Sequence, residues 1–359
     1  MSSVPALPDR RSGRVLAGAQ AGLIAAALLV LVLSGATGPA DVSLTESVQI
    51  VTGHLVPGLP WMSDGSLTPL QDQAVWQFRL PRTLLAGLAG AGLALAGTLM
   101  QAVVRNPLAE PYILGVSAGA GLGAVSVITL GSAALAGVTL STAAFAGALA
   151  ATAAVYLLAR LDGVLAPTRM ILAGVALGSL LSAVTSYLTL TTEAQNVFSV
   201  LFFLLGSVSA AGMDDLAIPA GALAAVTVFA LARARALNAL LVGDESATAL
   251  GLNVSRLRAQ LMIAAALLTG AIVSVSGGIG FVGLVVPHTA RILVGADHRR
   301  MLPIAVLGGA VFLMVCDLLA RTVAAPAEIP LGIITAIVGA PFFLWLIRRG
   351  HAGRAGMDR

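Results

Sequence analysis

The stretch RLPRTLLAGLAGAGLALAGTLMQAVVRNPLAEPYILGVSAG, residues 79–119, indicates the fold class of the whole chain. Two arginines flank Leu80 and Pro81, and a continuous apolar run follows them. A run of about twenty apolar residues is long enough to cross a bilayer as a helix. A polar segment from Gln101 to Pro111 closes the run before the next apolar run begins. The stretch therefore predicts a membrane-spanning helix with a charged start and a structured end.

The composition is that of an integral membrane protein. Of 359 residues, 58% are hydrophobic and 10% charged, with a mean hydropathy of +0.97. Soluble domains carry roughly 25% charged residues. Glycine is abundant, with 40 residues, and small residues allow helices to approach closely in lipid. Because the apolar runs are continuous and a β-barrel requires alternating segments, we expect an all-α membrane bundle.

Ten apolar runs predict about ten transmembrane helices within a single domain, residues 15–349. A further piece, 197–205, is too short to span and is expected to be a half-helix at the outer face. The polar ends, 1–14 and 350–359, are expected to be cytoplasmic tails. The ten runs cover residues 15–33, 82–103, 112–131, 138–159, 169–190, 214–233, 259–277, 279–294, 302–323 and 329–347.

The distribution of arginines supports this topology. All 20 basic residues are arginine, and in the expected topology they fall on the cytoplasmic side except for Arg79, Arg82 and Arg321, as the positive-inside rule requires. Residues 36–78 are then an extracytoplasmic loop, in which Ser43 and Glu46 form a capping box that starts a helix over 43–55. Pro57, Gly58, Pro60 and Gly65 break the chain after it.

The start of the second span is weakly repeated five spans later. Residues 79–82 open it from outside, and the related Arg256-Leu257-Arg258 opens the seventh span from inside. An offset of five helices reverses orientation, so the pattern predicts a 5+5 inverted repeat.

The outer arginines Arg79, Arg82 and Arg321 predict a docking surface for an acidic soluble partner. Arg321 follows Asp317 by four residues, so these two can pair on one helix face. Scattered outer acids, Asp64, Asp72 and Glu328 among them, can weaken the positive patch. The alternative is that the arginines extend to lipid headgroups.

The segment 236–256 is too polar to span and too apolar for a solvated loop. We expect two short amphipathic helices on the cytoplasmic face, the second opened by Asp244 and Glu245 and ended by Gly251. An interfacial helix on lipid is the alternative, but its polar face should carry basic residues. The two acids favour a protein partner.

Several kinds of site are excluded or disfavoured. The run SGGIGFVGLVVPH, residues 276–288, is rich in glycine, but there is no GxxxxGK[ST] and no lysine, so nucleotide binding by this chain is rejected. Close packing and a bend explain these glycines, and residues 105–111 predict a tight cytoplasmic turn. Cys316 is the single cysteine and the four histidines are scattered, so we expect no metal site, no cofactor in this chain and no catalytic residues.

Two rival functions remain at this point. A secondary transporter usually needs ionisable groups near the midplane, and Asp317 alone comes close to that depth. An intramembrane enzyme needs a converging nucleophile and base, and no such pair appears. Nucleic-acid binding is not expected, because the arginines are juxtamembrane.

Six blocks together resemble the FecCD-type permeases, the membrane subunits of ABC importers for ferric siderophores, haem and cobalamin. They occur in family order over about 76–350: RLPR at 79–82, GTLMQAVVRNPLAEPYILG at 97–115, GDESATALGL at 243–252, GGIGFVGLVVPH at 277–288, ADHR at 296–299 and EIPLGIITAIVGAPFFLWLI at 328–347.

The resemblance implies a type II ABC importer permease in the bacterial cytoplasmic membrane. Expected partners are a second permease subunit (identical or paralogous), two ATPase subunits that hold ATP and Mg, an extracytoplasmic binding protein, and membrane lipid. A ferric siderophore is the expected cargo, with cobalamin or haem as alternatives.

The resemblance also implies roles for particular residues. Arg79, Arg82 and Arg321 match positions that pair with glutamates of the binding protein, and Thr191, Thr192 and Gln195 lie near the family's gating turn. We expect charge reversal of the three arginines to weaken docking with the fold intact. The ATPase-coupling positions are Gly243, Asp244, Glu245, Ala247, Leu250 and Gly251.

Overall fold

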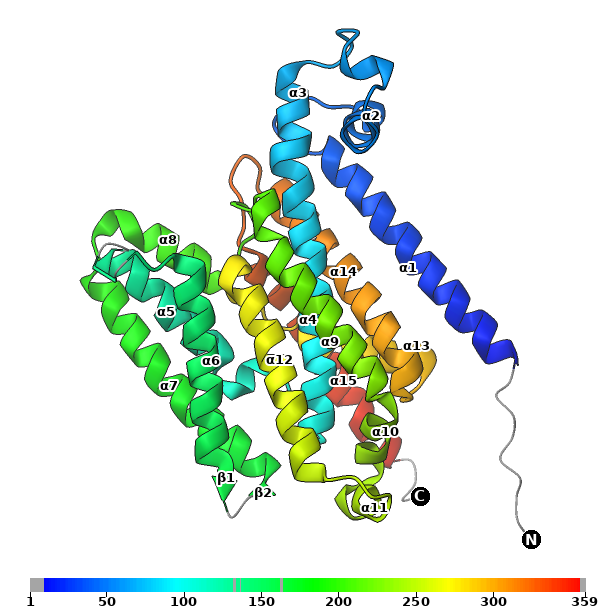
Figure 1. The fold of residues 1–359 in the computed structure, drawn as a ribbon, viewed down its shortest axis with the longest axis vertical. Helices are drawn as coiled ribbons and strands as arrows, with labels where there is room; N and C mark the ends of the chain where they lie inside the picture. Colours follow the sequence, from blue (N-terminus) through cyan, green and yellow to red (C-terminus); the bar gives the residue numbers. More distant parts are fainter. Residues whose placement is uncertain (1–9, 132–133, 136, 162–163, 356–359) are drawn as a thin grey trace.

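The computed structural model describes residues 10–131, 134–135, 137–161 and 164–355. Residues 1–9 of the expected N-terminal tail and 356–359 of the expected C-terminal tail lie outside the described residues. The expected all-α architecture is confirmed (Figure 1). Within the described part of the chain, the exceptions are β1 (Arg160–Leu161) and β2 (Val164–Leu165), two-residue strands that pair antiparallel.

Every predicted span corresponds to one helix. Three of these helices are shorter in their apolar part, namely α5 (Val116–Leu130), α13 (Val282–Val294) and α15 (Leu331–Ala355). The predicted half-helix is α8 (Ala194–Leu205). In the described residues, seven helices are long and apolar enough to cross a membrane: α1 (Arg10–Ala36), α4 (Leu80–Val104), α6 (Leu140–Ala159), α7 (Pro167–Thr191), α9 (Ala217–Ala232), α12 (Val254–Ser276) and α14 (His298–Thr322).

Short elements close both ends of the bundle (Figure 1). We call one end the α2 end, after α2 (Leu44–Leu55); it also carries η1 (Pro60–Met62), α3 (Pro69–Gln73) and the π-helical turn η2 (Ala74–Arg79). The opposite end, the α11 end, carries α10 (Ala234–Val242) and α11 (Asp244–Ala249). Two single turns remain, η3 (Pro111–Leu114) before α5 and η4 (Met213–Asp215) before α9.

The predicted loop 36–78 is only partly a loop. Its capping box is present, since Ser43 Oγ accepts from Glu46 N and Glu46 Oε2 accepts from Ser43 N at 2.7 Å. The chain is helical again from Pro69, however, so α3 and η2 extend α4 outward into one segment, Pro69–Val104. A second capping box at Thr68 and Gln71, followed by Pro69 at the first helical position, starts this extension.

Helix α4 is the buried centre of the bundle, and α9, α12, α13 and α14 all contact it. Its glycines allow backbones to touch: a Cβ on Gly90 would lie 2.0 Å from the carbonyl oxygen of Gly309 in α14. A Cβ on Gly97 would lie 2.2 Å from the carbonyl oxygen of Gly283 in α13. The predicted role of small residues in close packing therefore holds at the core of the fold.

The chain breaks between α12 and α13, where Gly277 adopts φ 65° against the carbonyl of Phe203. The predicted turn at 105–111 and Tyr112 directly after it supply partners for this break. Glu110 Oε1 accepts the Phe281 N–H at 2.8 Å, and the Tyr112 hydroxyl donates to Ile279 O at 2.8 Å. Irregular backbone is thus satisfied inside the protein, as it must be away from water.

The predicted inverted repeat remains a prediction, although its two marker sequences lie where it requires them. Arg79 and Arg82 lie at the α2 end of α4, whereas Arg256 and Arg258 lie at the α11 end of α12. These two helices contact each other.

Substitution Gly90→Ala should lower the free energy of unfolding by about 1–3 kcal/mol, because the new methyl group meets the Gly309 backbone. The matched control is Gly221→Ala in α9, where no atom lies within 4 Å of the added Cβ. Alanine favours a helix over glycine, so this control should be neutral or slightly stabilising. Thermal unfolding in detergent measures both, and equal losses would contradict a tight α4–α14 contact.

Candidate functional site

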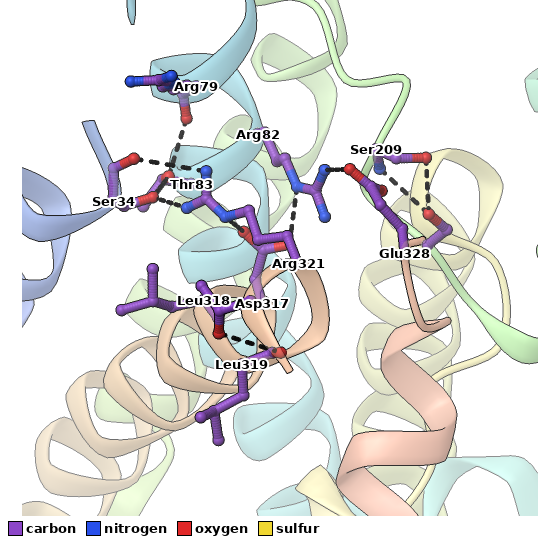
Figure 2. Close-up of polar contacts among 12 residues, drawn as sticks. Ser34, Arg79, Arg82, Thr83, Ser209, Asp317, Leu318, Leu319, Arg321 and Glu328 are labelled. Atoms are coloured by element: carbon purple, nitrogen blue, oxygen red, sulfur yellow. Dashed lines mark hydrogen bonds and ion pairs between the residues drawn. The ribbon is translucent and has the colours of Figure 1, made fainter. Parts of the chain in front are cut away.

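The three predicted docking arginines converge at the α2 end, where the start of α4 meets the end of α14 (Figure 2). They line one side of a hollow of about 820 Å³. Its other walls come from the loop after α1, from α3 and η2, and from the loop between α14 and α15, which contributes Glu328.

Arg79 is buried, with 6% of its surface exposed. Its guanidinium donates to Gly35 O at 2.8 Å and to Ala40 O at 2.6 Å. Gly35 lies in the last turn of α1 and Ala40 in the loop after it, so Arg79 fastens the end of α1 and this loop to the start of α4. The Arg79 guanidinium therefore binds backbone carbonyls inside the protein.

Arg82 bridges two carboxylates. Its Nε donates to Asp317 Oδ1 at 2.8 Å, and its Nη1 donates to Glu328 Oε1 at 2.7 Å. The side chain of Asp317 is 0% exposed and that of Glu328 is 39% exposed. Arg82 therefore joins a buried partner in α14 to a half-exposed one in the following loop.

Arg321 completes the cluster. Its Nε lies 3.5 Å from Asp317 Oδ2, which confirms the predicted pairing four residues apart on α14. Its Nη2 also donates to the hydroxyl of Ser34 in α1, and that hydroxyl contacts Thr83 in α4. Three helices, α1, α4 and α14, are therefore joined through one guanidinium.

These contacts correct the expectation of an open positive patch. The arginines are largely buried and line a hollow, and two of them, Arg82 and Arg321, are paired with the negative charges of Asp317 and Glu328. Simultaneous charge reversal is therefore incompatible with an intact fold, because it would bury carboxylates beside Asp317. Ser34 and Thr83 were missed, since no sequence signal links α1 to α14.

At the α11 end, the two predicted short helices are present as α10 and α11. Gly243 joins them with φ 131°, and Gly251 ends the second at φ 82°, as its predicted capping role requires. Ala247 is fully buried, whereas Glu245 is exposed and Leu250 is 73% exposed. Leu250 and Glu245 are thus available to a partner.

Asp244 is turned toward the bundle. It accepts two bonds from Arg258, from Nη1 at 2.8 Å and from Nη2 at 3.0 Å, and it lies 3.5 Å from Arg105 Nη1. Arg258 Nε also donates to Val103 O at the end of α4. Asp244 therefore ties α11 to α4 and α12, a role that the sequence interpretation did not assign to it.

Helix α10 is tied separately to the start of α14. Asn238 Nδ2 donates to Asp297 Oδ1 at 2.6 Å, and Asn238 Oδ1 accepts the His298 N–H at 2.9 Å. Partial burial raises the pKa of Asp297, but the bonds from Asn238 and the Arg299 N–H outweigh it, so this pKa lies below its ordinary value. Asp297 is therefore an ionised anchor at neutral pH.

The predicted gating residues lie at the α7–α8 turn and do not form a cluster. Thr191 Oγ1 bonds back to its own helix, at Leu188 O, and Gln195 Nε2 donates to Glu193 Oε2 at 2.5 Å. The Thr192 hydroxyl is buried and has no partner among the described residues.

A groove of about 540 Å³ between α5 and α7 was not predicted. None of the predicted gating residues lines it. Hydroxyl side chains follow its α7 wall, at Ser179, Ser182, Thr185 and Ser186. Their spacing of three and four residues places them on one helix face. This spacing is visible in the sequence and could have indicated a polar face on α7.

The chain is similar to known transport proteins over nearly its whole length. The sequence model of the FecCD transport family matches residues 26–349. A hemin transport system permease protein of Yersinia pestis is 42% identical over 294 residues, which cover 79% of this chain and 87% of that protein. A cobalamin import system permease protein of Halobacterium salinarum is 39% identical over 313 residues, 85% and 82% of the two chains.

Among solved structures, a metal-chelate type ABC transporter in an inward-facing conformation superposes with a TM-score of 0.79 at 32% identity. The match covers 92% of this chain and 98% of that chain. The residues matched by the family model, 26–349, include both the arginine cluster and the α10–α11 segment.

Substitution Asp317→Asn should lower the free energy of unfolding by about 3–5 kcal/mol, because it leaves buried guanidinium charge without its partner. The double variant Arg82→Gln/Asp317→Asn removes one charge of each sign and should cost less than the single one. Asp64→Asn, at an exposed carboxylate of the same end, is the control. A double variant less stable than Asp317→Asn would contradict the conclusion that Arg82 and Asp317 form a buried ion pair.

Proposed function

The chain belongs to the FecCD transport family, and we propose on that premise that it is the membrane-spanning permease subunit of an ATP-driven importer. Its fold is that of a type II ABC importer permease, a multi-pass membrane protein. One observation carries the proposal. The same helices, α4 and α14, link a charged hollow at one end to a segment with exposed apolar side chains at the other.

The α11 end is proposed to bind the ATPase subunits. The chain has no phosphate-binding GxxxxGK[ST] sequence, so ATP and Mg are assigned to two separate subunits. Leu250 and Glu245 are exposed there, and Asp244 connects α11 to α4 and α12. Movement of α11 by a bound ATPase therefore reaches the bundle through an ion pair. The bundle then alternates access between its two ends.

The α2 end is proposed to receive an extracytoplasmic substrate-binding protein. The hollow holds three arginines against two carboxylates, which leaves net positive charge for an acidic partner. Charge complementarity of this kind guides encounter and fixes orientation. This assignment places the α11 end in the cytoplasm of a bacterial cell.

The pathway is proposed to lie between this chain and a second permease subunit, identical or paralogous. Thr191, Thr192 and Gln195 are proposed to act at its gate. The hydroxyl groups along the α5–α7 groove suit a passage that contacts a ligand weakly.

The cargo is proposed to be a bulky metal complex. A ferric siderophore was the expectation from the sequence, whereas two close relatives are named for hemin and cobalamin. Haem, cobalamin and a ferric siderophore are therefore three candidate cargoes, and all three need to be tested.

Uptake should require ATP hydrolysis by the partner subunits. We expect liposomes with the permease, its ATPase and its binding protein to accumulate one of three labelled cargoes, a ferric siderophore, haem or cobalamin. An ATPase with its catalytic glutamate replaced is the control and should abolish uptake. Uptake that persists without hydrolysis would contradict the proposal and favour a secondary transporter.

Substitution Leu250→Asp should weaken ATPase binding about tenfold or more, because it puts a charge into an apolar contact at the α11 end. Leu55→Asp is the matched control, since Leu55 is 68% exposed at the α2 end. Co-purification of the ATPase with each variant measures the effect. Equal retention of the ATPase by both variants would exclude Leu250 from that interface.

A further inference from the structure

The hollow at the α2 end already contains a carboxylate in the place where a partner's carboxylate is needed. We propose that docking proceeds by exchange, in which an acidic side chain of the soluble partner displaces Glu328 from Arg82. This inference rests on the proposed function, which supplies the partner and places it at this end.

The two carboxylates on Arg82 are not equivalent. Asp317 is 0% exposed within α14, and its contacts to Arg82 and Arg321 are enclosed by protein. The side chain of Glu328 is 39% exposed, and it follows exposed residues, 322–327, in the loop before α15. Solvent-exposed ion pairs contribute little to stability, whereas breaking a buried pair is costly. Glu328 is therefore the carboxylate that an incoming group can replace.

The backbone beside Glu328 is anchored, so exchange requires only a side-chain movement. Ile329 N donates to Ala320 O at 3.0 Å, and Leu331 N donates to Gly206 O at 2.8 Å. These bonds hold the loop against α14 and against the chain after α8. Rotation of the Glu328 side chain releases Arg82 Nη1 and leaves the fold unchanged.

Among the three arginines, Arg82 is the one suited to exchange. Arg79 donates to two backbone carbonyls, and Arg321 is held by Ser34 and Asp317. Arg82 uses Nε and Nη1 for its two carboxylates, Nη2 has no partner among the residues drawn in Figure 2, and the Nη1 partner is half-exposed. A carboxylate that takes the place of Glu328 can therefore bind both nitrogens at once, in the bidentate geometry that arginine favours.

The walls of the hollow fit a protein side chain. Leu70, Phe78, Pro39 and Pro326 line the hollow together with the arginines and Glu328. A glutamate or aspartate on a projecting loop meets apolar contacts at its stem and a guanidinium at its tip. The volume of about 820 Å³ accommodates more than one side chain of such a loop.

Substitution Glu328→Gln should strengthen docking, because Arg82 no longer has a competing internal carboxylate. The test uses the complete transporter in nanodiscs and its purified, labelled substrate-binding protein, at low salt. Its Kd should fall about fivefold, the ratio expected from one partly exposed ion pair. The control, Asp64→Asn, removes a carboxylate of the same end that is not bound to arginine, and should leave Kd within about a factor of two.

The neutralised pair Arg82→Gln/Asp317→Asn separates this inference from the proposed function. It should weaken docking about tenfold, and adding Glu328→Gln to it should bring no gain. If the neutralised pair docks as tightly as the unchanged chain, the docking role of the hollow is wrong. If it docks weakly but Glu328→Gln alone does not tighten binding, or Asp64→Asn tightens it equally, the exchange is wrong and the docking role stands.

Discussion

The close approach of α4 and α14 is the constraint on which the rest of the molecule depends. Gly90 and Gly309 face each other, and either one would place an added Cβ within 2.3 Å of the other's carbonyl oxygen. This contact brings Asp317 of α14 to Arg82 of α4. At the other end, α4 meets Arg258 and α14 begins beside Asn238. The polar contacts at both ends of the bundle thus depend on one pair of helices in backbone contact.

Each end uses an aspartate between two arginines, but with different burial. Asp317 lies between Arg82 and Arg321 and is fully enclosed, whereas Asp244 lies between Arg258 and Arg105 and is 43% exposed. A buried pair resists separation and a solvated pair exchanges readily. The Asp244 ion pairs at the α11 end are therefore suited to repeated movement, and the Asp317 ion pairs at the α2 end to holding Arg82 and Arg321 in place.

The sequence predicted those features that depend on neighbours along the chain. Apolar length located the spans, the Ser43–Glu46 spacing located α2, and the four-residue step from Asp317 predicted its contact with Arg321. Contacts between distant segments were not predictable in the same way. Arg82 and Glu328 are separated by 246 positions, and no periodicity indicates which acid reaches which arginine. An open patch was therefore expected where the structure has a buried network.

The central position of α4 also constrains the order in which the helices can pack during synthesis. Four helices that bury it, α9, α12, α13 and α14, all begin at or after Ala217, far along the chain. Until they enter the bilayer, the glycine face of α4 has no permanent neighbour among them, and Arg82 lacks both of its carboxylates. The second span of the chain thus completes its packing only near the end of synthesis. A truncated chain that stops after α8 lacks the four helices that make most of the contacts to its most buried helix.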